Sequence, residues 1–214
     1  MNELHKYKQT RFIDPELKHL GYAYYTIRKS IFNAVLKLKK EIKGNVCDLG
    51  CGIMPYKEFL LENKGITNYI GIDLYNSEYE EAVKPDLYWD GITIPLEDDS
   101  CDYVIATEFL EHYHSTEHIL KEIHRVLKKD GCFFFTVPCV WEIHGKPFDE
   151  YRFTPFSLQK YFVKLNFTQI EIKPLGDINT SLIIIFGLWL ENSHLSNLQQ
   201  KIYRNLFKLY IDFC

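Results

Sequence analysis

The sequence predicts an α/β protein with a doubly wound, mostly parallel sheet that has helices on both faces. Three observations lead to this prediction. Short apolar segments alternate with amphipathic segments along most of the chain, a G-x-G turn follows the first strand-like segment, and an acidic residue lies in the second. Such alternation is typical of βαβ units, in which helices connect parallel strands.

The first half of the chain contains a long helix and four expected strands. Apolar residues recur every three or four positions over 16–42, which predicts a helix that begins near Asp14 and Pro15 and ends at Gly44. A short helix is expected over 55–63. The strand-like segments cover residues 45–49, 68–74, 86–90 and 101–107.

The second half continues the alternation. An amphipathic helix is expected over 116–129, ended by Gly131, and an apolar strand over 132–138. A second helix is expected over 154–164, with Thr154 and Pro155 at its start, and a sixth strand over 167–175. The sheet should therefore contain six strands.

The C-terminal part leaves two alternatives open. Residues 182–186 could form a seventh, antiparallel strand, or that strand is missing; we favour its absence. The apolar run 182–190 is about half as long as a membrane span, and membrane contact is kept as a hypothesis only. We expect a single domain with three parts: a helical cap (1–43), a cofactor-binding core (44–176) and an apolar C-terminal segment (177–214).

Composition limits the classes of partner and compartment. The chain has 214 residues, 46% of them hydrophobic, and a net charge of −4. It therefore lacks the basic character expected of a nucleic-acid-binding protein. Six cysteines without a C-x-x-C pair and a polar N-terminus predict a cytoplasmic protein with reduced thiols and no signal peptide.

The G-x-G turn predicts a nucleoside cofactor. Gly50 and Gly52 permit close backbone approach, and Asp73 occupies the position at which a carboxylate binds ribose hydroxyls. Met54 stands where a dinucleotide loop has its third glycine, and Pro55 lacks an amide hydrogen, which disfavours a pyrophosphate. S-adenosylmethionine, which contains a nucleoside and an amino acid but no phosphate, fits these features better.

These motifs resemble class I S-adenosylmethionine-dependent methyltransferases of the type 11 kind, which have a Rossmann-like fold. The family motif D-x-G-x-G-x-G appears at residues 48–54, except that Met54 replaces its last glycine. The proline–tyrosine pair after this loop resembles a branch often linked to glycan or cell-surface biosynthesis. Further segments match at Asp73, Asp90, 110–112 (LEH), 125–131 (RVLKKDG) and 146–158 (KPFDEYRFTPFSL).

The resemblance implies a set of cofactor contacts. Asp48 and nearby amides would hold the amino-acid end, Asp73 the ribose and Asp90 the adenine. Thr107 and Glu108 would lie where the fourth strand opens under the sulfonium. The expected cofactor-binding residues are Asp48, Gly50, Cys51, Gly52, Asp73, Leu74, Asp90, Gly91, Thr107 and Glu108.

The expected activity is transfer of a methyl group to a small-molecule or glycan-intermediate acceptor, at a hydroxyl, carboxylate or amine. His112, after the fourth strand, and His144, in the loop after the fifth, are the candidate bases. Tyr151 and Arg152 are expected to contact the acceptor. Alternatively, Arg152 forms an internal salt bridge.

No metal is expected from the sequence. His114 and His118 are spaced i, i+4, but they have no H-E-x-x-H motif or cysteine partner. The main alternative to an enzyme is a non-catalytic protein of this fold. In that case Met54 would have weakened the site, and the protein would bind only a cofactor or a partner. A nucleotide-dependent oxidoreductase is disfavoured by the missing glycine and by Pro55.

Overall fold

The computed structural model describes residues 3–75 and 83–213. The chain forms two compact units, which are described separately. One unit, here the sheet unit, comprises residues 34–139 and 143–173. The other, here the helical unit, comprises 1–33, 140–142 and 174–214. The expected single domain with three parts remains a prediction.

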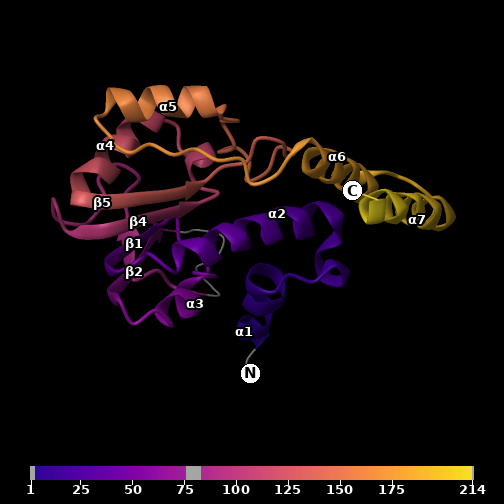
Figure 1. Cartoon of the computed structure of the whole chain (residues 1–214), viewed down its shortest axis with the longest axis horizontal. Coiled ribbons are helices and arrows are strands. Elements are labelled where there is room, and N and C mark those ends of the chain that lie inside the picture. Colours follow the sequence, from indigo (N-terminus) through magenta and orange to yellow (C-terminus); the bar gives the residue numbers. More distant parts are fainter. Residues whose placement is uncertain (1–2, 76–82, 214) are drawn as a thin grey trace. The chain divides into compact units, whose positions relative to one another are not determined.

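The sheet unit contains five parallel strands in the order β3-β2-β1-β4-β5 (Figure 1). This confirms the predicted doubly wound α/β fold. Because the strand order reverses between β1 and β4, the carboxyl ends of these strands form a switch point, where ligands bind in such sheets. The strands are β1 (Gly44–Leu49), β2 (Ile66–Leu74), β3 (Leu87–Trp89), β4 (Cys101–Thr107) and β5 (Leu127–Thr136).

Helices cover both faces of this sheet, as predicted. In Figure 1, α4 (Thr116–Val126) and α5 (Pro155–Lys164) lie on one face and α3 (Lys57–Leu61) on the other. The amphipathic pattern of α4 explains its position, because its apolar side chains Ile119, Leu120, Ile123 and Val126 are all fully buried. The predicted cap of α5 is present as a reciprocal pair of hydrogen bonds between Thr154 and Ser157.

Two predicted helix ends were wrong. Helix α4 ends at Val126, three residues before the expected end, because Leu127 takes an extended conformation and pairs with Cys101 of β4. Gly131 consequently lies inside β5. Helix α2 (Leu17–Leu38) starts within one residue of the expected position but ends four residues before the expected residue 42. Asp14, the expected N-cap of this helix, instead ends the short π-helix η1 (Gln9–Ile13).

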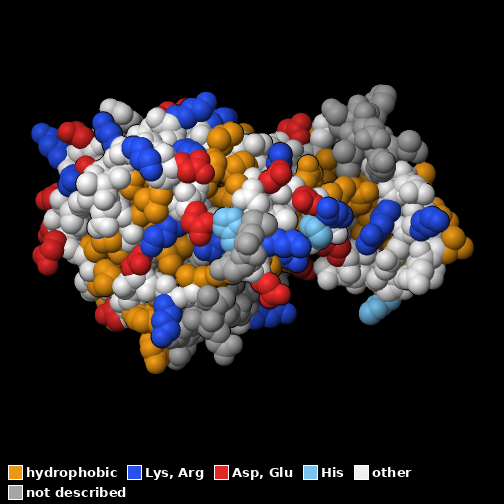
Figure 2. Space-filling view, turned by 90° about the horizontal axis from the view of Figure 1, so that it is seen from below, with side chains coloured by type: hydrophobic (Ala, Val, Ile, Leu, Met, Phe, Trp, Pro, Cys, Tyr) orange, Lys and Arg blue, Asp and Glu red, His pale blue; other side chains and the backbone are white. Residues whose placement is uncertain are grey.

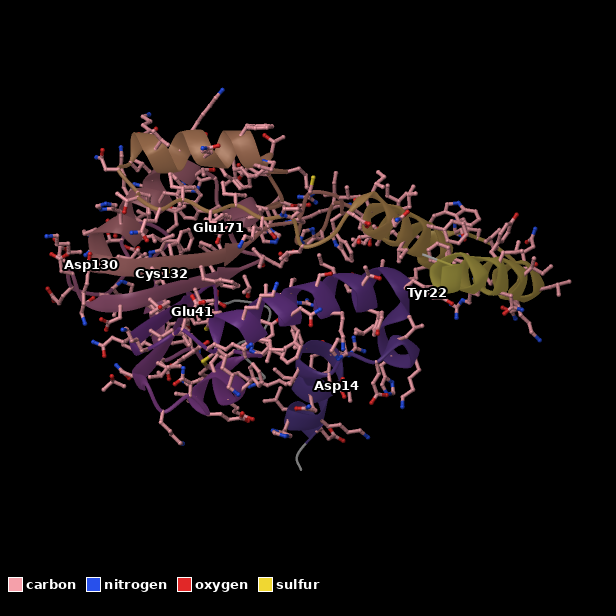
Figure 3. All side chains as sticks on the ribbon, in the orientation of Figure 1. Asp14, Tyr22, Glu41, Asp130, Cys132 and Glu171 are labelled. Atoms are coloured by element: carbon pink, nitrogen blue, oxygen red, sulfur yellow. The ribbon has the colours of Figure 1, made fainter. Side chains whose placement is uncertain are left out.

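The prediction of a sixth strand was also wrong. Residues 167–175 pair with no strand of the described sheet, although Phe167, Ile170 and Ile172 pack against the core. The alternating pattern therefore reflects partial burial without strand pairing. Figure 3 labels Glu171 in this segment and Cys132 on β5, which is an edge strand.

The helical unit contains α1 (Glu3–Lys8), η1, most of α2, α6 (Ile178–Asn192) and α7 (Asn197–Phe213). Residues 182–186 are helical within α6, so the alternative that makes them a seventh strand is wrong. The Phe207 ring lies 5.1 Å from Tyr22 and 4.3 Å from Phe186, centroid to centroid. Segments from both ends of the chain thus pack together in this unit.

A kink in α2 is compensated within the helical unit. Gly21 has φ +75°, which interrupts the helix. The carboxylate of Glu191 in α6 accepts hydrogen bonds from the backbone of Ala23 and Tyr22, so the amides exposed by the kink are satisfied.

The surface carries charges of both signs (Figure 2), and several cysteines are buried. Figure 2 shows basic and acidic side chains interspersed over the face in view. No helix in the described ranges is both long and apolar enough to cross a membrane. The cysteines of the described part are free thiols, with Cys47, Cys51 and Cys101 buried and Cys132 and Cys139 exposed.

Candidate functional site

The loop after β1 has the backbone geometry that its glycines predict. Gly50 and Gly52 have φ values of 66° and 48°, which favour glycine. A Cβ on Gly50 would lie 2.3 Å from the Phe109 ring, so a side chain would be excluded there. The amides of Gly50 and Cys51 donate to the carbonyl of Ile72 at 2.9 and 3.1 Å, which ties the loop to β2.

The structure brings Asp73 to this loop, as the sequence predicts. Its Oδ2 accepts a hydrogen bond from the Gly52 amide at 2.8 Å, and its Oδ1 accepts one from the Leu74 amide at 2.8 Å. Burial raises the pKa of the carboxyl. Each carboxylate oxygen can accept a further bond, so the two amides orient the group without exhausting its capacity to bind a diol.

Asp48 lies beneath the loop and is almost fully buried. Its side chain is 5% exposed and accepts a hydrogen bond from the Tyr69 hydroxyl at 2.6 Å. Burial raises the pKa of Asp48 to about 7. Tyr69 was not among the predicted site residues, although its position in a strand that pairs with β1 was the available signal.

Asp48→Asn should remove a pH dependence of stability in the cofactor-free protein. A folded pKa near 7, above the unfolded value of about 3.9, means that this carboxyl destabilises the fold increasingly as pH rises from about 4 to about 7. Between pH 6 and pH 8 the free energy of unfolding of the wild type should fall by about 1.4 kcal/mol relative to the variant. Urea unfolding of both proteins at the two pH values tests this, and parallel changes would contradict the assignment.

The side chain of Met54, at the end of this loop, packs against β2. Met54 has φ 49° and is 5% exposed, and a Cβ on Gly71 of β2 would lie 2.5 Å from its Sδ. Its side chain thus fills space against the sheet. The glycine turn and the oriented Asp73 carboxylate together fit a phosphate-free nucleoside cofactor.

Asp90 and Gly91 form a turn after β3. The Asp90 Oδ1 accepts hydrogen bonds from the amides of Ile92 and Thr93 at 2.8 and 2.9 Å, which hold the pKa of this exposed carboxyl below its usual value. The Gly91 carbonyl accepts a hydrogen bond from the Tyr113 hydroxyl at 2.6 Å. Asp90 thus has a structural role in the turn, and its contact with adenine remains a prediction.

Thr107 and Glu108 mark the end of β4. Glu108 has φ 52°, an unusual value for a residue with a side chain. Its amide donates to the carbonyl of Thr136 at 3.0 Å, which joins the ends of β4 and β5. The chain turns sharply here toward η2 (Leu110–His112), a short 3-10 helix.

The two candidate bases meet in the structure. His112 belongs to η2 and His144 to the loop after β5, and their ring centroids lie 4.7 Å apart in an edge-on arrangement. The pKa of His112 is lowered by burial and by His144. The amides of Glu150 and Tyr151 donate to the Glu111 carbonyl at 2.9 and 3.2 Å, which fixes the loop over η2.

Glu111 is fully buried beside these histidines. Burial, followed by the nearby Glu108 carboxylate, raises the pKa of Glu111 to about 9. The group is therefore protonated near neutral pH unless a cation is present. Glu111 was predicted only as part of the LEH motif, because burial of this side chain cannot be read from that pattern.

Arg152 forms an internal salt bridge. Its Nη1 and Nη2 lie 2.6 and 2.7 Å from the two carboxylate oxygens of Asp149, whose side chain is 1% exposed. This bidentate contact holds the pKa of Asp149 well below its usual range. The Tyr151 hydroxyl donates to the His114 carbonyl at 2.9 Å. These contacts favour the salt-bridge alternative, and contact of Tyr151 and Arg152 with an acceptor remains a prediction.

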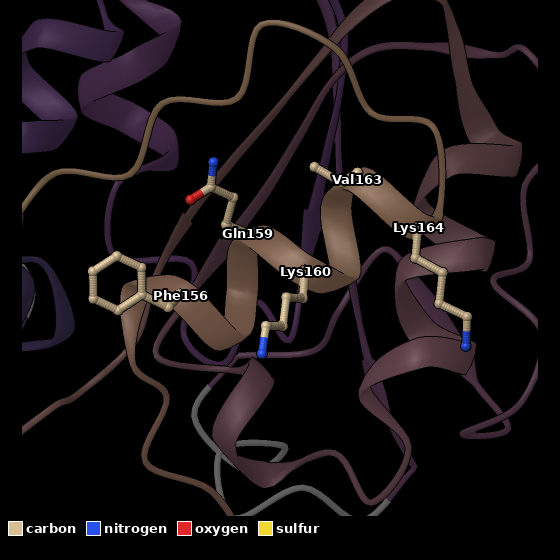
Figure 4. A pocket seen from close by; sticks show the side chains of 5 residues that line it. All are labelled: Phe156, Gln159, Lys160, Val163 and Lys164. Atoms are coloured by element: carbon tan, nitrogen blue, oxygen red, sulfur yellow. The ribbon is translucent and has the colours of Figure 1, made fainter.

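A shallow surface depression lies elsewhere, on the outer side of α5. Figure 4 shows that one helix supplies all five lining residues, and none of them is a predicted site residue. They are Phe156, Gln159, Lys160, Val163 and Lys164.

Comparison with known proteins finds a recognised domain in this part of the chain. Residues 47–135 match the model of a family described as a methyltransferase domain. An uncharacterized protein of Methanocaldococcus jannaschii is 29% identical over 108 residues, which cover 50% of this chain and 42% of that protein. The chain thus spans less than half the length of this relative.

Solved structures share the fold. An S-adenosylmethionine-dependent methyltransferase from Mesorhizobium loti aligns with a TM-score of 0.52 and 19% identity, over 64% of this chain and 80% of that chain. Phosphoethanolamine N-methyltransferase 2 from Haemonchus contortus, in complex with S-adenosyl-L-methionine, gives a TM-score of 0.53 and 18% identity, over 86% and 48%. At these identities the similarity establishes the fold.

Proposed function

We propose that this chain, whose residues 47–135 match a methyltransferase domain of the S-adenosylmethionine-dependent fold, transfers a methyl group from that cofactor to a small-molecule or glycan-intermediate acceptor. One observation carries the proposal. The Asp73 carboxylate meets the Gly52 amide at the carboxyl edge of β1 and β2, where a nucleoside binds in this type of sheet.

The chain would hold and orient the cofactor, which supplies a methyl group already activated on a sulfonium. Asp73 and Leu74 would bind the ribose, and Asp90 with Gly91 the adenine. The backbone at Gly50, Cys51 and Gly52, with Asp48 beneath it, would hold the amino-acid end. Thr107 and Glu108 would line the opening toward the methyl group. Positioning and exclusion of water account for much of the acceleration in such a reaction.

His112 and His144 would act on the acceptor. The lowered pKa of His112 keeps its ring neutral near pH 7, so it could accept a proton from an acceptor hydroxyl. An acceptor carboxylate or amine would depend less on a base. A glycan-type acceptor is supported by the resemblance of the Pro55–Tyr56 pair to the branch linked to cell-surface biosynthesis.

A non-catalytic cofactor-binding protein is the second candidate, since Met54 replaces a glycine of the motif. Calorimetric titration with S-adenosylmethionine, S-adenosylhomocysteine and NAD tests cofactor choice, and turnover on a panel of hydroxyl, carboxylate and amine acceptors tests catalysis. Absence of binding to the first two compounds would contradict both candidates. Binding without turnover would favour the second.

Met54→Gly should leave the affinity for S-adenosylmethionine within a few-fold of wild type, because the Met54 side chain packs against Gly71. It should create no affinity for NAD, since Pro55 still lacks an amide hydrogen. The loss of a buried side chain destabilises the protein, whereas glycine tolerates the positive φ at this position and offsets part of that cost. The free energy of unfolding should therefore fall by about 1–3 kcal/mol. Titration of both proteins measures this; strong binding only in the variant would show that Met54 blocks the site.

A further inference from the structure

Three side chains with metal-binding atoms converge next to the candidate bases. Glu111 and His112 come from η2, and His144 comes from the loop after β5. One potential ligand atom of each lies within 4.8 Å of the others. The Glu111 Oε1 and the His112 Nε2 are 3.7 Å apart.

Glu111 provides a second, independent observation. Its side chain is 0% exposed, and neither carboxyl oxygen has a hydrogen-bond partner within the described part of the chain. Its contact with His112 exceeds hydrogen-bond distance. A buried carboxyl without partners is unfavourable, and a bound ion is one of the groups that satisfy such a residue.

Both histidines have the supporting contacts typical of metal ligands. The Nδ1 of His144 lies 3.2 Å from Asp149 Oδ2, and Arg152 fixes that carboxylate in turn. The His112 ring has a hydrogen bond with the backbone of Phe148. A histidine that ligates a metal through one ring nitrogen usually donates through the other to a carboxylate or a carbonyl.

We propose that Glu111, His112 and His144 bind a divalent transition-metal ion, and that zinc suits this ligand set best. Two imidazoles and one carboxylate leave a fourth position open, as in catalytic zinc sites. Bonds of about 2.0–2.2 Å place ligand atoms roughly 3.0–3.5 Å apart. The three side chains would therefore close on the ion by about 1 Å.

The role of this ion rests on the proposed function, whereas ion binding itself does not. With the ion in place, His112 and His144 would be ligands, and the general-base role proposed for them would be taken over by the ion and water. An acceptor hydroxyl bound at the open position would have a lowered pKa and would release its proton to water. The metal would thus replace the general base.

The test is calorimetric titration of chelator-treated protein with Zn²⁺. Thiols also bind zinc, so the titration uses a background in which the exposed residues Cys132 and Cys139 are replaced by serine, as is Cys214. Glu111→Gln and His144→Ala are compared with the matched control His114→Ala, which removes an exposed histidine outside the cluster. Circular dichroism checks that each protein is folded.

We expect one zinc ion per chain, an affinity at least tenfold weaker in Glu111→Gln and in His144→Ala, and no change in His114→Ala. X-ray absorption of the loaded protein should show nitrogen and oxygen ligands only. Equal affinity in all variants, sulfur ligation, or no stoichiometric binding would overturn the proposal. His144→Ala keeps the test decisive if Glu111→Gln does not fold. Titration with S-adenosylmethionine is independent, so failure of the metal site is distinguishable from failure of the proposed function.

Discussion

Asp73→Ala is expected to lower the affinity for S-adenosylmethionine by at least tenfold while the protein remains folded. Hydrogen bonds from a carboxylate to a ribose diol contribute roughly 1.5–3 kcal/mol each, and the variant loses both. It also loses the contact that holds the Gly52 amide at 2.8 Å, so the glycine turn is less well fixed. Calorimetric titration measures the affinity, and thermal unfolding reports whether the fold survives.

Asp86→Ala is a matched control for this experiment. Asp86 also accepts a hydrogen bond from a backbone amide of β2, that of Gly71 at 2.8 Å, but it is not a predicted cofactor residue. Its removal should change the affinity for S-adenosylmethionine by no more than about twofold, because solvent screens the effect of the Asp86 charge on the cofactor site. Unchanged affinity in Asp73→Ala would remove the main support for the cofactor site.

The sequence was most informative where one local signal determined the structure. Strands β1, β2 and β4 follow from apolar segments with clear ends, and the meeting of Gly52 with Asp73 follows from the parallel arrangement of adjacent strands. The end of α4 was less predictable. Lys128 and Lys129 suit a helix C-terminus, but pairing of Leu127 with β4 takes precedence over that preference.

The acceptor side could be predicted only in part. His112 and His144 were identified separately, whereas their edge-on contact depends on how the loop after β5 folds over η2. The burial of Glu111 and the contact of Asp149 with His144 arise from the same fold of this loop. Because periodicity reports faces of helices and strands, it contains no information about such loop contacts.

Arg152→Met is expected to lower the free energy of unfolding by about 2–3 kcal/mol. The variant keeps an unbranched apolar side chain but leaves the carboxylate of Asp149, which is 1% exposed, without its bidentate partner. Breaking a buried ion pair from one side is costly because a buried charge remains uncompensated, although partial exposure of Arg152 reduces the effect. Urea unfolding at pH 7 measures the change.

The double variant Asp149→Asn/Arg152→Met is the control, because it removes the charge as well as its partner. It should lose clearly less stability than the sum of the two single variants, and an additive loss would argue against a coupled pair.

The pH dependence separates the two roles considered for Arg152. The folded pKa of Asp149 lies below the unfolded value of about 3.9, so the ion pair stabilises the protein above that pH, and this stabilisation is lost as pH falls through the folded pKa. Arg152→Met should therefore lose stability at pH 7 but differ little from wild type at the acid limit. If Arg152 instead serves mainly to bind an acidic acceptor, the variant should keep its stability at pH 7 and show a raised KM for that acceptor. Unfolding and steady-state kinetics on the same preparation decide between the two roles.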